Sequence, residues 1–238
     1  MTSAKSKGSQ KNLYDHPLPD DKIIFWDTNF VISALFPSFK ERYENLCSKA
    51  THTPLSIAEL EERQNLAYLF KRHQASAAFI ERLIQSEMNV AFSSILFTEV
   101  YFGIKYIELE TVYGSREQAK KELGDDPKIL TQHIPAILRN WNLFLELLGK
   151  FPGRIFAINP TEAVIVTEVL RLRIQYGLTP NDSFHLATSI TSGCKDIVAF
   201  DRALTNVGID EGLNVWCTFF QKKDPGVART PGLGNRPE

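Results

Sequence analysis

The stretch IIFWDTNFVIS, residues 23–33, changes its pattern halfway along. Its first four residues are continuously apolar, which predicts a buried β-strand, whereas the apolar residues after Asn29 recur at helical spacing. Asp27, Thr28 and Asn29 stand between the two halves and place polar side chains where the strand ends. Two interpretations are open at this point: these residues only cap the following helix, or Asp27 belongs to a functional site.

Further apolar runs predict a sheet of five strands with helices between them. The expected strands are KIIFW (22–26), NVAFS (89–93), RIFAI (154–158), DIVAF (196–200) and LNVWC (213–217). Strands that alternate with helices predict an α/β fold with a central, mostly parallel sheet flanked by helices. Open sheets of this kind bind ligands beyond the carboxyl ends of their strands.

Short polar signals predict where several helices begin. The signals are two pairs with capping-box spacing, Ser56 with Glu59 and Ser115 with Gln118, and two proline-containing starts, Asn159–Pro160 and Thr179–Pro180. The two capping pairs lie in long segments, about 37–88 and 105–150, which we interpret as helical insertions. Gly177 is expected to end the helix that contains the apolar stretch 163–174.

Composition predicts one large domain over residues 21–220. The chain has 238 residues, of which 43% are hydrophobic, enough to bury a sizeable core. Residues 1–20 and 221–238 are polar and have no periodic apolar positions, so both are expected to be disordered tails. No apolar run reaches the roughly 18 residues of a membrane span, and the first residues do not resemble a secretion signal. We therefore expect a cytoplasmic protein without a membrane partner.

The balance of charges limits the way in which a polyanion is bound. The 27 Lys and Arg residues are matched by 28 Asp and Glu residues, so the chain is not a strongly basic nucleic-acid binder. Any polyanion must be held locally.

Four acidic residues are predicted at one edge of the sheet. Asp27 ends the first strand, Asp201 follows the fourth, Glu99 lies early in the helix after the second, and Asp182 lies in the first turn of a later helix. Each has a simpler explanation, as a helix cap, a solvated helical residue or an acid that complements the helix dipole. However, four residues with only such roles need not converge on one place.

Convergent carboxylates favour a bound cation. Like charges at close range raise one another's pKa, whereas a divalent cation favours the ionised form of all of them. Oxygen ligands suit Mg²⁺ or Mn²⁺. Two such ions about 4 Å apart can activate a water molecule and stabilise the leaving oxygen of a phosphodiester, which is nuclease chemistry.

The order of four segments resembles the PIN-domain nucleases, and among them the VapC-type toxins of toxin–antitoxin pairs. The segments are IIFWDTNFVISALF, VAFSSILFTEVYFGI, GLTPNDSFHLATSI and DIVAFDRALTNVGI. The resemblance implies a PIN-like fold and cleavage of RNA with Mg²⁺ or Mn²⁺. It assigns metal binding and catalysis to Asp27, Glu99, Asp182 and Asp201. It also gives Thr28 and Asn29 a supporting role, through hydrogen bonds to a carboxylate or a metal-bound water.

The resemblance further implies partners. They are an RNA substrate, a cognate antitoxin protein and a second copy of the chain in a homodimer. Two departures from the family pattern are visible: the chain is longer than common VapC-type toxins, and Ala199 stands two residues before Asp201, where many relatives have Thr or Ser. The greater length leaves open a non-toxin PIN nuclease that processes RNA. A PIN-like scaffold that binds RNA or protein without cleaving it is a further alternative.

Two other residues lie close to the expected site in sequence. His185 is one turn beyond Asp182 and could face the site as a ligand, but the family's metal ligands are carboxylates, so we favour a helix-packing role. Arg202 follows Asp201 and is a candidate contact to a substrate phosphate, with a plain surface role as the alternative.

Overall fold

A computed structural model describes residues 7–14, 16–35, 38–113, 118, 121 and 127–218. All strand pairs of its single sheet are parallel, and the strand order is β1-β6-β5-β2-β3-β4. The strands are β1 (Gln10–Asn12), β2 (Ile23–Trp26), β3 (Asn89–Ser93), β4 (Ile155–Ile158), β5 (Asp196–Val198) and β6 (Asn214–Cys217). The expected α/β fold with a parallel sheet is therefore confirmed.

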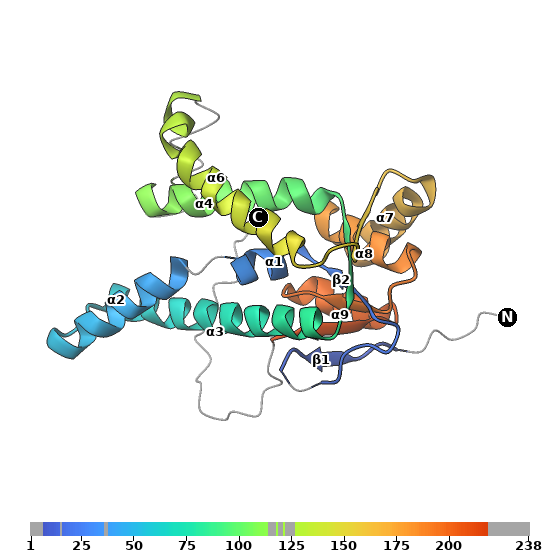
Figure 1. Cartoon of the computed structure of the whole chain (residues 1–238), viewed down its shortest axis with the longest axis horizontal. Helices are drawn as coiled ribbons and strands as arrows, with labels where there is room; N and C mark the ends of the chain where they lie inside the picture. The colour runs from blue at the N-terminus through green and yellow to red at the C-terminus, as the bar shows by residue number, and fades with distance from the viewer. Residues whose placement is uncertain are drawn as a thin grey trace, which may run out of the picture.

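Helices connect the strands and cover the sheet. They are α1 (Thr28–Leu35), α2 (Ser38–His52), α3 (Ile57–Gln85), α4 (Ile95–Tyr113), α6 (Pro127–Gly149), α7 (Ala163–Tyr176), α8 (Pro180–Thr191) and α9 (Arg202–Asp210). Figure 1 shows α2 and the adjoining part of α3 extending away from the sheet, while α4 and α6 lie side by side. Within the described residues, no helix has the length and apolar character needed to cross a membrane.

Alternating side chains of the strands form two cores, one on each face of the sheet. Ile24 and Trp26 of β2 pack with residues of α1, α3, α4 and α6, whereas Phe25 between them packs with residues of α7, α8 and α9. Because successive side chains of a strand point to opposite faces, a strand buried on both faces reads as a continuous apolar run. This arrangement explains why the apolar run at residues 23–26 predicted its strand.

The expectation of five strands was wrong, because the described residues form a sheet of six strands. The additional strand, β1, lies in the segment 1–20 that we expected to be a disordered tail. It pairs with the edge of β6, and Leu13, which follows it, is 1% exposed. Three polar residues on an edge strand leave no apolar alternation in the sequence, which is why this strand was missed. Residues 1–6 and the expected tail 221–238 lie outside the described residues.

The signals for helix starts and ends had mixed outcomes. Ser56 caps α3 in a complete capping box with Glu59, Thr179 caps α8, and Gly177 ends α7 with a left-handed φ of 67°. The predicted start at Asn159–Pro160 was wrong, because α7 begins at Ala163. The side chain of Asn159 instead accepts a hydrogen bond from the backbone N–H of Thr161, which holds a turn. The proposed cap at Ser115 lies outside the described residues.

Candidate active site

The carboxyl ends of β2 and β5 meet where the order of strands reverses. From β2 the chain continues to β3 and β4 on one side, whereas β5 and β6 lie on the other side. The backbone N–H of Asp27 donates to the carbonyl of Val198 at 3.1 Å, so the two strand ends are joined at this point. In open α/β sheets, such a reversal leaves a crevice outside the strand ends.

A cavity of about 280 Å³ opens at this edge of the sheet. Asp27, Glu99 and Asp182 line it together, although they come from three segments far apart in the chain. Thr28 and Asn29 line it as well. The structure thus brings together three of the four acids named from the sequence and both supporting residues.

The fourth acid, Asp201, and its neighbour Arg202 are not among the lining residues of this cavity. Asp201 caps α9, because its Oδ1 accepts a hydrogen bond of 3.0 Å from the N–H of Leu204. Its charge nevertheless contributes to the raised pKa of Asp182, so the two carboxylates are electrostatic neighbours. Asp201 therefore has the cap role and also lies near the cavity, while Arg202 is exposed.

Asp27 is the most deeply buried of the acids, with 2% of its surface exposed. Burial raises its pKa to about 6, and the negative charges of Glu99 and Asp182 act in the same direction. The charge of His185 and a hydrogen bond of 3.2 Å from the N–H of Asn29 to Oδ2 oppose this rise. At neutral pH, ionisation of this carboxylate therefore costs free energy in the folded protein.

The pKa of Glu99 is shifted in the opposite direction from that of Asp27. The hydroxyl of Thr28 donates to its Oε2, and Nε2 of His185 lies 2.5 Å from the same oxygen. Burial opposes ionisation of Glu99, but these hydrogen bonds outweigh it and lower the pKa of the carboxyl. Nε2 of His185 is also 3.2 Å from the Thr28 hydroxyl, so the three side chains form one cluster.

His185 is a buried helix-packing residue, as expected, with its ring edge to face against Phe25, but it also contacts Glu99. Its side chain is 1% exposed, and burial alone would lower the pKa of the imidazole, but the hydrogen bond to Glu99 and the neighbouring charges raise it. The sequence placed His185 one turn beyond Asp182, and that spacing was the available signal. Its pairing with Glu99 joins residues 86 positions apart and could not be read from the sequence.

Asp182 lies in the first turn of α8, beside the residue that caps this helix. The hydroxyl of Thr179 donates to its Oδ2 at 2.5 Å, and the N–H of Asp182 lies 3.3 Å from that hydroxyl oxygen. Burial raises the pKa of Asp182, although the hydrogen bond from Thr179 opposes the rise. The residue therefore supports its own helix and also presents a carboxylate to the cavity.

One cation near the acids was missed from the sequence. Arg72, on α3, donates from Nη2 to the carbonyl of Asn29 at 3.2 Å, and its guanidinium lies 4.2 Å from the centre of the Phe200 ring. Burial lowers the pKa of Arg72, while the charges of Asp27 and Asp201 act in the opposite direction. Nothing in the local sequence of a long helix indicates which arginine reaches the segments that follow β2 and β5.

Carboxylate oxygens are ligands that suit Mg²⁺ or Mn²⁺, and the cavity presents three carboxylates. In the described part of the chain, however, no group of three or more His, Cys, Asp or Glu side chains forms a ready ligand cluster. The hydrogen bonds of Thr28 and Thr179 occupy oxygens of Glu99 and Asp182. These contacts involve Oε2 of Glu99 and Oδ2 of Asp182, and a carboxylate has further lone pairs with which to bind a cation.

Comparison of the chain with protein-family models, with curated proteins and with solved structures gives no match.

Proposed function

We propose that this chain is a metal-dependent endoribonuclease that hydrolyses RNA phosphodiester bonds at the cavity. The observation that carries the proposal is the convergence of Asp27, Glu99 and Asp182 on one cavity at the carboxyl edge of a parallel sheet. Burial of like charges is costly, and a site that accumulates them is suited to a divalent cation. The resemblance of the four segments to PIN-domain nucleases supports the same chemistry.

In this proposal Asp27, Glu99 and Asp182 hold Mg²⁺ or Mn²⁺, and Asp201 adds negative charge at the periphery. A bound ion of this kind lowers the pKa of a water molecule and stabilises the leaving oxygen of the phosphodiester. Thr28 and His185 keep Glu99 ionised and oriented, and the N–H of Asn29 orients the carboxylate of Asp27. The chain then needs no nucleophile of its own.

The reaction balances with water as the nucleophile. The water oxygen forms a bond to phosphorus while the bond from phosphorus to the 3′ oxygen breaks. The water gives up a proton to solvent, and the leaving 3′ oxygen takes up a proton from solvent. The products carry a 5′-phosphate and a 3′-hydroxyl. A reaction that used the 2′-hydroxyl of RNA would instead leave a 2′,3′-cyclic phosphate.

The test is cleavage of a labelled single-stranded RNA with Mg²⁺ or Mn²⁺ and with a chelator. We expect cleavage only with the metal, and 5′-phosphate on the products. Asp27→Asn and Asp182→Asn should lower the rate at least about a hundredfold, because each removes a charge that the ion requires. Asp210→Asn, an exposed acid at the end of α9, is the matched control and should cleave like the parent.

Two results would overturn the proposal. One is cleavage that persists in chelator or leaves 2′,3′-cyclic phosphate. The other is equal activity of the Asp27→Asn variant and the parent. The first result would exclude a metal-activated water, and the second would exclude Asp27 from the chemistry.

One observation favours a second candidate, a PIN-like scaffold that binds RNA or protein without cleaving it. Glu99 and Asp182 already accept hydrogen bonds from Thr28, His185 and Thr179, and the described residues hold no ready metal cluster. The same RNA assay separates the two candidates, since a scaffold would retain RNA in Mn²⁺ without shortening it.

The proposal leaves two cellular roles, a toxin with a cognate antitoxin or a nuclease of RNA processing. A small gene directly upstream that encodes a DNA-binding antitoxin would favour the toxin. A homodimer belongs to the toxin version of the proposal, and sedimentation of the purified chain tests it.

A further inference from the structure

Beyond the acids, the cavity has an aromatic wall formed by α4. Phe102 and Tyr106 line it together with Glu99 and Glu110, and these four positions repeat at helical spacing along one side of the helix. Phe102 is 43% exposed although it is a large apolar residue. The wall is therefore continuous with the acidic end of the cavity and presents an uncovered ring.

The ring of Phe102 has aromatic neighbours that lead to the core. It meets Tyr101 edge to face at 5.6 Å, Tyr101 meets Trp141 of α6 at 6.5 Å, and Trp141 meets the fully buried Phe144 at 5.3 Å. This row of rings connects the exposed aromatic to the core through the second helical insertion. Edge-to-face contacts at such distances are favourable and orient the ring.

Close packing of α1 against α4 gives the wall a defined place beside the acids. A Cβ on Gly103 would lie 2.4 Å from Cδ1 of Ile32, so only glycine allows this approach without a shift. Glu99 and Phe102 are three residues apart, which is about 4.5 Å along a helix axis, and Tyr106 is about 10.5 Å from Glu99 on the same axis. A group bound against the wall is thus within one nucleotide of a phosphate bound at the acids.

The chemistry of the lining selects among ligands. A purely apolar ligand would strip water from the carboxylates of Glu99 and Glu110 without replacing their hydrogen bonds, which is costly. A nucleobase combines a flat face, which stacks on an aromatic ring, with N–H groups at its edge that carboxylates accept. A cavity of about 280 Å³ admits one base and not a duplex, whose bases are also covered on both faces.

We infer that the aromatic wall of α4, and in it the ring of Phe102, is a stacking site for one unpaired nucleobase of single-stranded RNA, next to the phosphate that is cleaved. The inference rests on the proposed function for the identity of the nucleic acid. It assigns a role to the second helical insertion, because Trp141 contacts Tyr101, whose ring in turn meets that of Phe102.

The experiment uses an oligoribonucleotide that contains 2-aminopurine, whose fluorescence is quenched when the base stacks. Binding is measured with Mg²⁺ in the Asp27→Asn background, in which cleavage is expected to be blocked, and KM and kcat are measured separately with the parent acids. Phe102→Ala should weaken binding about 5- to 100-fold, abolish the quenching and raise KM more than it lowers kcat. Phe102→Trp keeps an aromatic face and should retain both the binding and the quenching.

Phe156→Ala on β4 is the matched control, because Phe156 is 48% exposed and does not line the cavity. It should leave binding and quenching unchanged. Equal binding by Phe102→Ala and Phe156→Ala would overturn the inference, as would equal binding of the same sequence as a duplex. If the parent then still cleaves RNA, the nuclease proposal stands and only the stacking site is lost. If quenching depends on Phe102 but the protein shows no metal-dependent cleavage, the stacking site stands and the nuclease proposal is lost.

Discussion

At the scale of single residues, Asp27 carries the least favourable charge among the acids of the candidate site. Its carboxyl is buried at the end of β2, close to the charges of Glu99 and Asp182. Burial is the main reason for its raised pKa, and the acids add to it. A residue that only capped α1 would gain from its charge, since anions are favoured at a helix start. The raised pKa of Asp27 indicates instead that its charge costs free energy in the folded protein.

This cost predicts how stability depends on pH. The pKa of Asp27 rises from 3.8 to about 6 on folding. Between pH 3.8 and 6, Asp27 is therefore protonated more often in the folded than in the unfolded state. The charge therefore costs stability above pH 6, by up to about 3 kcal/mol, and the cost disappears as the pH falls towards 4. In chelator, Asp27→Asn should stabilise the protein most at pH 7.5 and about half as much at pH 5.

Urea unfolding of the parent and the variant at both pH values measures this effect. The comparison between the two pH values removes any constant cost of the amide group. Asp210→Asn, an exposed carboxyl, should change the free energy of unfolding by less than about 0.5 kcal/mol at either pH. A variant whose effect is the same at pH 5 and pH 7.5 would show that Asp27 does not titrate in this range.

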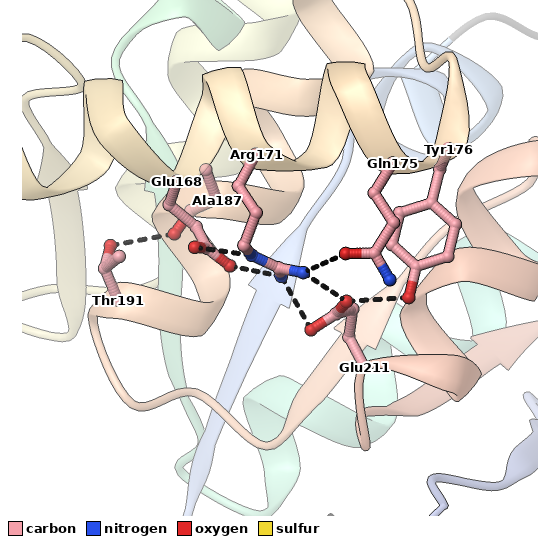
Figure 2. Close-up of polar contacts among 7 residues, drawn as sticks. All are labelled: Glu168, Arg171, Gln175, Tyr176, Ala187, Thr191 and Glu211. Atoms are coloured by element: carbon pink, nitrogen blue, oxygen red, sulfur yellow. Dashed lines mark hydrogen bonds and ion pairs between the residues drawn. The ribbon is translucent and has the colours of Figure 1, made fainter.

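At the scale of elements, one ionic network ties α7 to the turn between α9 and β6. Figure 2 shows Arg171 of α7 between Glu168 on its own helix and Glu211 in that turn. Nη2 of Arg171 is 2.7 Å from Glu211, and the hydroxyl of Tyr176 donates to the same carboxylate at 2.8 Å. The side chain of Glu211 is 3% exposed, so its charge depends on these partners.

Removal of the arginine should leave a buried charge without its cation. We expect Arg171→Met to lower the free energy of unfolding by about 2 kcal/mol, which is less than for a fully buried pair because Arg171 is 36% exposed. Arg171→Lys should recover only part of this loss, since a lysine cannot form the paired hydrogen bonds of a guanidinium. Arg173→Met, an exposed arginine on the same helix, is the control and should cost less than about 1 kcal/mol. Equal losses in the two methionine variants would remove the network from the energetics of the fold.

At the scale of the whole molecule, the order of strands creates the site. The chain continues from β2 to β3 and β4 on one side of β2, whereas β5 pairs with β2 in parallel on the other side. Asp27 and Asp201 therefore follow neighbouring strands despite their separation in sequence. Helices α4 and α8 then bring Glu99 and Asp182 to the same edge. No local signal near any one acid specifies this convergence.

The outermost strand of the sheet yields a prediction about folding. Leu13 follows β1 and is buried in the core on the α3 face, so Leu13→Ala should lower the free energy of unfolding by about 2–5 kcal/mol. Tyr14→Ala, at the adjacent and 42% exposed position, should cost much less. Chemical unfolding of both variants measures this difference. A Leu13→Ala variant as stable as the parent would show that the segment with β1 and Leu13 does not contribute to the core.

Several features of the fold could be predicted because their causes are local. The strand at residues 89–93 and the caps at Ser56 and Thr179 depend on side chains within a few positions of one another. The positions of Asp27 and Glu99 relative to their strand and helix follow from the same local patterns. Apolar periodicity and capping spacing are physical requirements of single elements, and a single sequence carries them.

Only the tertiary structure decided which of these residues meet. His185 reaches Glu99 across 86 positions, Arg72 reaches Asn29 across 43, and β1 joins the sheet by pairing with β6. Burial also had to be decided in three dimensions, since the raised pKa of Asp27 and the exposure of Phe102 depend on what packs around them. Contacts between distant segments depend on the arrangement of all the elements, and that arrangement is set by the packing of both faces of the sheet, which no short stretch of the sequence specifies.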